Sequence, residues 1–271
     1  MKLLFLGDVV GRAGRDAVGE RLPALIVQYG FDFVVINGEN ASHGRGLTEH
    51  HFAELKAAGA DAVTLGDHAW DQRDTLTYIG RAPTLIRPIN MPPGTPGSGA
   101  NLITGRNGHR VLVVNALGRV FMDPADDPFR AVEAAIAACP LGEQADAVIV
   151  DFHTEATSEI QAMGFFLDGK ASLVVGTHTH IPTADQRILK SGTALMADAG
   201  MCGDFDSIIG VEIDEPLNRF LTGVPQNRFT PAEGEATLCG VAIETDSRTG
   251  LTLSVSPVRI GGTLSQALPA F

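Results

Sequence analysis

Carboxylate, amide and imidazole side chains stand at the ends of several short apolar runs in this chain. His178 and His180 are the clearest pair, because side chains two residues apart share one face of an extended segment. Imidazole is a borderline ligand that suits iron, manganese or zinc. The pair alone also fits a polar strand end with two exposed histidines, so a metal site requires ligands from elsewhere. The further candidates, which follow other apolar runs, are Asp8, Glu39, Asn40, Asp67, His68 and His153.

The apolar runs themselves are short and end at polar residues or glycine. They cover residues 2–6, 33–36, 62–65, 147–150 and 173–175. Such runs are typical of buried strands in a mostly parallel sheet, and the ligand site of an open α/β sheet lies at the carboxyl ends of its strands. If the runs are neighbouring strands of one fold, the polar residues after them converge. They are too many ligands for one ion and about right for two.

Several of these residues also have a purely structural interpretation. Asp8 and Asp67 precede predicted helices and could cap them, although Asp71 competes with Asp67 for that position. His153 alone is more typical of a buried histidine that is satisfied by hydrogen bonds. Glu39 is less ambiguous, because no helix follows it directly and its side chain is long enough to bridge two ions.

The remaining histidines are predicted to lie on the surface. His43 stands in a Gly-rich loop with Arg45, and both are weak candidates for contact with substrate. His50 and His51 fall on a predicted helix, and His109 falls in a predicted turn.

Helices are predicted between the strands, which gives the alternation typical of βαβ units. The predicted helices cover residues 16–29, 48–58, 71–78, 128–138 and 158–167. Further strands are predicted around residues 102–103 and 111–114, and two antiparallel hairpins after His180, with turns at 191–192 and 246–250. The Pro/Gly-rich loop 87–99 is a poor linker, because strands resume directly after it. We therefore expect a single α/β domain over residues 1–271.

Composition and charge exclude several classes of protein. The formal net charge of −12 argues against long nucleic acids, whose binding depends on Lys and Arg. It still permits a small phosphate ester, because bound metal makes a site locally positive. The chain contains no apolar stretch of ~18 residues, so no membrane span is predicted. The N-terminal apolar run is too short for a signal peptide. Three widely spaced cysteines form no disulfide framework, which favours a reducing cytoplasm.

Motifs of other enzyme classes do not occur in the chain. It contains no P-loop of the form G-x-x-x-x-G-K-[ST], and the glycines between residues 7 and 14 lack the spacing of a dinucleotide-binding G-x-G-x-x-G. It also contains no G-x-S-x-G nucleophile elbow.

The order of the polar residues resembles that of the calcineurin-like metallophosphoesterases. The resemblance is greatest to their YmdB-type branch, which comprises bacterial 2′,3′-cyclic-nucleotide phosphodiesterases. The strings that carry it are Gly7–Gly11, Asn37–Asn40, Asp67–Asp71, Arg87–Asn90, Pro93–Gly97, Thr177–Asp185 and Asp206–Gly210. They run across most of the chain and are specific as a set.

This resemblance implies a mixed-sheet α/β sandwich that binds two metal ions, usually iron or manganese, with magnesium or zinc as alternatives. It implies that one ion is held by Asp8, Glu39, Asn40 and His180. It implies that the other is held by Glu39, Asp67, His153 and His178. His68 would act as an acid or electrostatic group, and family members tend to form homo-oligomers.

Two positions depart from the pattern of the wider superfamily. Where this chain has Gly66-Asp67-His68, the superfamily usually has Gly-Asn-His, so Asp67 adds a negative charge at a ligand position. The additional carboxylate lowers the expected Lewis acidity of the ions or changes the preferred metal. Val10 stands where the superfamily usually has the histidine of Asp-x-His, as in the YmdB-type branch.

The sequence thus predicts a metal-dependent phosphoric diester hydrolase that acts on small phosphodiesters, with 2′,3′-cyclic nucleotides as the implied substrates. Two metal ions would activate water and stabilise phosphate charge, and His68 would protonate the leaving oxygen. Two alternatives stay open. One is a phosphomonoesterase or nuclease of the same fold. The other is a regulatory protein-binding module with structural metals. This alternative is compatible with Asp67 in place of the superfamily's usual asparagine.

Overall fold

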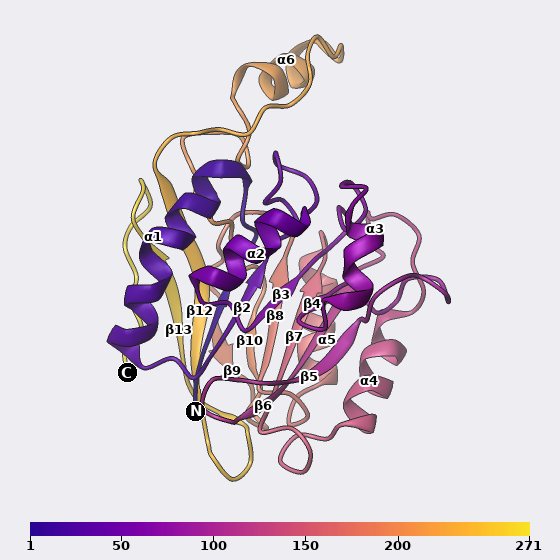
Figure 1. Cartoon of the computed structure of the whole chain (residues 1–271), viewed down its shortest axis with the longest axis vertical. Coiled ribbons are helices and arrows are strands. Elements are labelled where there is room, and N and C mark those ends of the chain that lie inside the picture. The colour runs from indigo at the N-terminus through magenta and orange to yellow at the C-terminus, as the bar shows by residue number, and fades with distance from the viewer.

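The computed structural model describes residues 1–271, and the pattern of strand β1 (Lys2–Leu6) explains its layers. Successive side chains of a strand point to opposite faces of the sheet. Leu4 and Leu6 pack with helical residues in one core cluster, whereas Leu3 and Phe5 pack with strands of a second sheet in another. Because all four side chains are buried, both faces of this sheet are covered. The result is two stacked sheets with helices on the outer faces (Figure 1).

The first sheet joins the beginning of the chain to its end. Strand β1 is parallel to β2, β2 to β3 and β3 to β4, while β12 runs antiparallel to β1 and pairs with both β13 and β11. The bounds are β2 Phe33–Asn37, β3 Ala62–Thr64, β4 Leu85–Ile86, β11 Gly203–Asp204, β12 Ala236–Thr245 and β13 Thr252–Ile260. Helices α1 (Gly11–Tyr29) and α2 (Glu49–Ala58) contribute to the core on its outer face.

The second sheet is built from the middle of the chain in the order β5-β6-β7-β8-β10-β9. Four central strands are parallel, and β5 and β9 are antiparallel edges. The bounds are β5 Ala100–Thr104, β6 Arg110–Leu117, β7 Ala147–His153, β8 Leu173–Thr177, β9 Arg187–Ile188 and β10 Ala194–Met196. Helices α4 (Pro128–Ala138) and α5 (Thr157–Phe166) pack on its outer face.

All five apolar runs form strands, but the expectation of one mostly parallel sheet is wrong. Strands β1, β2 and β3 belong to the first sheet, whereas β7 and β8 belong to the second. The mixed-sheet α/β sandwich implied by the resemblance is confirmed. Hydrophobic pattern cannot assign a strand to either sheet here, because strands of both sheets are buried on both faces.

Helix ends were predicted well where a capping residue marks them. Thr48 precedes α2 and its Oγ1 accepts a hydrogen bond from His51 N over 3.3 Å, and Gly59 ends the helix in the left-handed region. Helix α1 begins earlier than expected, at Gly11. The helix predicted over 71–78 is reduced to α3 (Thr75–Tyr78) and the 3₁₀ turn η1 (Ile79–Arg81).

One segment contains a helix that the sequence analysis did not predict. Residues 205–235, here called the arm, connect β11 to β12 and carry helix α6 (Asp214–Thr222). Figure 1 shows the arm projecting from one end of the sandwich, with α6 at its far end. Its apolar side chains are largely exposed, including Phe220 and Leu221. No helix in the chain has the length and apolar character needed to cross a membrane.

The pairing of β1 with β12 predicts an effect of Gly240. This residue lies opposite Leu6, and a Cβ there would overlap the carbonyl oxygen of Phe5. Overpacking at a backbone contact costs about 1–3 kcal/mol, so Gly240→Ala is expected to lower the free energy of unfolding by about 3 kcal/mol in denaturant titrations. Gly19→Ala, at an exposed position of α1 with open space around it, is the control and is expected to add about 0.5–1 kcal/mol. Equal behaviour of the two variants would contradict this view of the sheet.

Candidate metal centre

The carboxyl ends of parallel strands from both sheets meet at one end of the sandwich. Asp8 follows β1, Glu39 and Asn40 follow β2, and Asp67 and His68 follow β3. His153 is the last residue of β7, and His178 and His180 follow β8. The sequence-predicted residues therefore come together, although they derive from two sheets.

Four of them form one tight group around the ring of His153. Its Nε2 atom lies 2.9 Å from Asp67 Oδ1, 3.2 Å from Glu39 Oε1 and 3.0 Å from His178 Nδ1. One ligand atom from each of the four residues lies within 4.8 Å of all the others. This is the set that the resemblance implies for one of the two ions.

The second implied set lies beside the first and contains oxygens with no hydrogen-bond partner. Asp8 Oδ1 is 3.9 Å from His153 Nδ1, and it is buried and unpaired, as is Asn40 Oδ1. Buried polar atoms are almost always satisfied, and hard cations bind carboxylate and amide oxygens. His180 donates from Nδ1 to the carbonyl of Ile209 over 2.7 Å, which leaves Nε2 for a metal. The residues present therefore fit a cation at this position.

The backbone of the two histidines differs from the expected extended strand. Strand β8 ends at Thr177, and both His178 (φ 109°) and His180 (φ 68°) lie in the left-handed region. Such conformations cost about 1–3 kcal/mol in non-glycine residues and cluster at functional sites. The turn sends His178 to the group around His153, while His180 contacts Ile209 of the arm.

The electrostatics of the group show how strongly it requires positive charge. Burial raises the pKa of Asp8 to about 7. Burial also raises the pKa of Asp67, but hydrogen bonds from His153 and His178 outweigh it and hold that pKa well below its usual range. Burial lowers the pKa of His153, yet the negative charge of Glu39 and the hydrogen bond to Asp67 place it well above its usual value. The carboxylates thus draw a proton onto His153, at the position where a cation would lie.

A hydrogen-bond chain behind His153 fixes which nitrogen faces the group. Thr177 donates from its hydroxyl to Asp151 Oδ1 over 2.7 Å, so the 2.8 Å contact between Thr177 Oγ1 and His153 Nδ1 makes Nδ1 the donor. Asn37 donates to Asp151 Oδ2 over 3.0 Å. His153 Nε2 is therefore available to a metal, an arrangement typical of metal-ligating histidines.

Sequence reasoning did not identify Asn37, Asp151 and Thr177, which form this hydrogen-bond chain, and it did not identify Asp198. Asp198 accepts hydrogen bonds from Thr179 N, Thr179 Oγ1 and Gly200 N, and so holds the turn between His178 and His180. The available signal was the occurrence of Asn37 and Asp151 inside buried strands. Unpaired polar groups are costly at such positions.

His68 lies at the edge of the group in an oriented position. Its backbone N–H donates to Glu39 Oε2 over 3.2 Å, and its Nδ1 lies 3.1 Å from Asp71 Oδ2. Its Nε2 is 3.9 Å from Asp67 Oδ2, too far for a hydrogen bond. The ring is thus held from one side while Nε2 can reach a ligand.

A cavity of about 430 Å³ opens over these residues. Glu39, Asn40, His68, His178 and His180 contribute polar lining. Arg45, a weak candidate from sequence, lies on the same cavity, whereas His43 does not line it.

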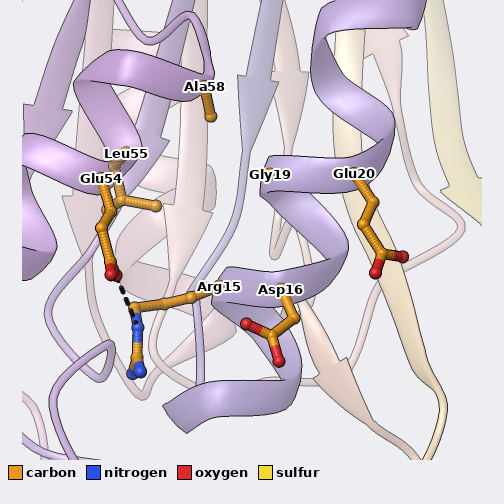
Figure 2. Close-up of a pocket in the computed structure, with 7 residues that line it drawn as sticks. All are labelled: Arg15, Asp16, Gly19, Glu20, Glu54, Leu55 and Ala58. Carbon is orange, nitrogen blue, oxygen red and sulfur yellow. Dashed lines mark hydrogen bonds and ion pairs between the residues drawn. The ribbon is translucent and has the colours of Figure 1, made fainter.

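A second hollow, of about 280 Å³, lies between α1 and α2 and contains none of the candidate ligands (Figure 2). Its main polar contact is the ion pair between Arg15 and Glu54, 3.1 Å apart. Beside it, His50 and His51 approach Glu54 closely enough to hold an ion. Glu54 is already paired with Arg15 and lies 3.1 Å from His50. His50 and Glu54 are exposed and His51 is half-buried, so the group is explained as a surface network.

Comparison with known proteins identifies the family. A family model described as YmdB-like protein matches residues 4–258. The chain belongs to this family. It is 46% identical over 260 residues to a Bacillus subtilis protein named 2′,3′-cyclic-nucleotide 2′-phosphodiesterase, and the match covers 96% of this chain and 97% of that protein. The resemblance inferred from sequence is confirmed.

Solved structures of similar proteins share the whole architecture. A hypothetical protein from Thermus thermophilus is 42% identical, with a TM-score of 0.89 over 97% of this chain and 100% of that one. A structure titled as a novel phosphatase from Mycoplasma pneumoniae is 34% identical, with a TM-score of 0.89 over 96% of this chain and 93% of that one.

The two groups of ligands predict distinct losses of metal. Glu39 belongs to both groups, so Glu39→Ala is expected to lose both ions, whereas His153→Ala and His180→Ala each lower the content from about two ions per chain to about one. Elemental analysis of protein purified without chelator measures the content, and circular dichroism checks the fold. His109→Ala is the control, because the His109 ring is half-exposed and lies in the turn between β5 and β6, away from the candidate ligands. A His153→Ala protein with unchanged metal content would refute the grouping.

Proposed function

We propose that the protein is a metal-dependent phosphoric diester hydrolase whose substrates are small phosphodiesters of the 2′,3′-cyclic-nucleotide class. The observation that carries the proposal is the convergence of buried carboxylates and imidazoles, together with two unpaired buried oxygens, beneath one cavity. The activity named for the B. subtilis relative, at 46% identity, supports the substrate class.

The donor set defines the metals that the site would hold. Asp8, Glu39, Asn40 and His180 would bind one ion, and Glu39, Asp67, His153 and His178 the other. Imidazole combined with carboxylate suits iron, manganese and zinc better than magnesium, which prefers oxygen and water. We assign iron or manganese. Bound ions would supply an activated water and stabilise the charge that develops on the phosphate.

The chain's own residues would position the substrate and transfer a proton. Asp71 orients the His68 ring, and the free Nε2 of His68 would donate to the leaving oxygen. Arg45 lies on the cavity wall and would attract a phosphate group. The cavity volume of about 430 Å³ is large enough for a mononucleotide, and the net charge of −12 disfavours long nucleic acids.

The proposal includes the setting in which the enzyme works. It comprises one domain over residues 1–271, assembly into a homo-oligomer and a cytoplasmic location. The three free, buried cysteines are compatible with a reducing compartment. The core cluster between the sheets joins strands from both ends and the middle of the chain, which supports a single domain.

Activity on defined substrates tests the function. The metal-loaded protein is expected to hydrolyse 2′,3′-cyclic AMP and bis-p-nitrophenyl phosphate, to lose activity in EDTA, and to regain it with manganese or iron. Turnover of p-nitrophenyl phosphate is expected to be much slower. Preference for the monoester would indicate a phosphomonoesterase, and a metal-loaded protein without turnover on any diester would favour a regulatory module.

The role of His68 predicts a loss of rate without a loss of metal. General acids contribute about 10²–10⁴-fold, so His68→Ala is expected to lower kcat for 2′,3′-cyclic AMP by that factor while metal content stays at the wild-type level. His43→Ala, from the neighbouring loop and outside the cavity lining, is the control. Loss of metal from the His68 variant would make His68 a ligand instead.

A further inference from the structure

The cavity over the candidate metal centre has two chemically different parts. The polar part consists of candidate ligands, His68 and Arg45. The apolar part comes mainly from the arm, and its arm residues are Ile208, Ile209, Val211, Pro216, Phe220 and Phe229. A ligand that fills the cavity therefore needs a charged group at one part and an apolar body at the other.

Two phenylalanine rings belong to the apolar part, and neither serves the core. Phe220 lies on α6 with 84% of its surface exposed, and Phe229 follows the helix with 42% exposed. Exposed aromatic rings on a cavity wall are typical of binding surfaces rather than of fold stabilisation.

The arm holds Phe229 in a defined position. The Arg219 guanidinium lies over the Phe229 ring, 4.1 Å from its centroid. Arg219 is fixed by Glu215, whose Oε1 accepts its Nε hydrogen bond over 2.6 Å, and Glu215 also accepts from the backbone N–H groups of Gln226 and Asn227. The segment that carries Phe229 is therefore attached to α6, so the two rings are displayed by one cross-linked unit.

We propose that Phe220 and Phe229 form a stacking platform for the nucleobase of the substrate, while its cyclic phosphate lies at the candidate metal centre. The inference rests on the proposed function and assigns substrate-contacting residues to it. Every base has an apolar π-face, and stacking on an aromatic ring contributes about 1–3 kcal/mol per base. Phenylalanine has no polar atom with which to read base edges. The platform therefore accepts all four bases and favours purines, which have the larger ring system.

A pair of substrates with and without a base tests the platform. The first is 2′,3′-cyclic AMP. The second is glycerol 1,2-cyclic phosphate, which has the same five-membered cyclic diester and no aromatic group. Hydrolysis of both is followed by ³¹P NMR. Phe220→Ala and Phe229→Ala are expected to lower kcat/KM for 2′,3′-cyclic AMP by about 5- to 150-fold and to leave that for the glycerol diester unchanged.

Matched variants separate stacking from general effects on the arm. Leu221→Ala removes the neighbouring side chain, which is 75% exposed and does not line the cavity, and is expected to behave as wild type. Phe220→Trp is expected to restore activity on 2′,3′-cyclic AMP, whereas Phe220→Leu restores it only in part. The wild-type preference for 2′,3′-cyclic AMP over 2′,3′-cyclic CMP is expected to shrink in the alanine variants.

The possible failures are distinguishable. If the wild type hydrolyses neither cyclic diester, the proposed function fails and the inference falls with it. If the wild type hydrolyses both and the alanine variants lose activity on both equally, or lose none, the platform alone is refuted. A fall in molecular mass by light scattering in both Phe220→Ala and Leu221→Ala, with equal losses on the two substrates, would instead make this face a contact between copies of the chain.

Discussion

Burial of several carboxylates around one histidine is the constraint on which the rest of the structure depends. Asp8 and Glu39 are almost completely buried, and Asp67 shares its Oδ1 with His153 and His178. Removing a carboxylate from water costs several kcal/mol unless an opposite charge lies close by. One imidazolium cannot balance three carboxylates. Binding of cations would relieve the cost in the native state alone, so metal and fold are expected to stabilise each other.

The two-sheet architecture is what makes such a concentration of charge possible. Strand ends from both sheets reach the same end of the sandwich, and each brings only one or two polar residues. Close approach is essential there. A Cβ at Gly66 would overlap Glu39 Oε2 and lie 2.6 Å from His153 Nε2. The short β3 strand can therefore deliver Asp67 and His68 only because glycine precedes them.

The sequence predicted these strand ends because each buried strand is a short apolar run that ends at polar residues, and such runs are recognised from sequence alone. It could not predict the turn at His178 and His180, because positive φ is uncommon in non-glycine residues, and the enrichment of histidine in that region is too weak to separate a turn from an extended strand end. The orienting chain of Asn37, Asp151 and Thr177 was also missed, since its members are polar residues whose partners lie far away in sequence. The arm was missed although Leu217, Phe220 and Leu221 have the i, i+3, i+4 spacing of an amphipathic helix, because α6 is only 9 residues long and such a short pattern is easily overlooked.

Asp67 illustrates how a local departure from a superfamily pattern can be balanced locally. The additional negative charge lies 2.9 Å from His153 Nε2 and 3.4 Å from His178 Nδ1, so the Asp67 carboxylate accepts hydrogen bonds from both rings.

The arm is joined to the sandwich through β11 and β12, which lie at the side of β1 away from the parallel strands. Changes in α6 and in the segment after it can therefore alter the apolar part of the cavity, whereas Ile209, at the start of the arm, also holds the candidate ligand His180 through its carbonyl. In the proposed function, the chemistry of the phosphate belongs to the strand ends, and selection of the group attached to the phosphate belongs to an inserted segment. Such a separation predicts that relatives differ more in the arm than at the strand ends.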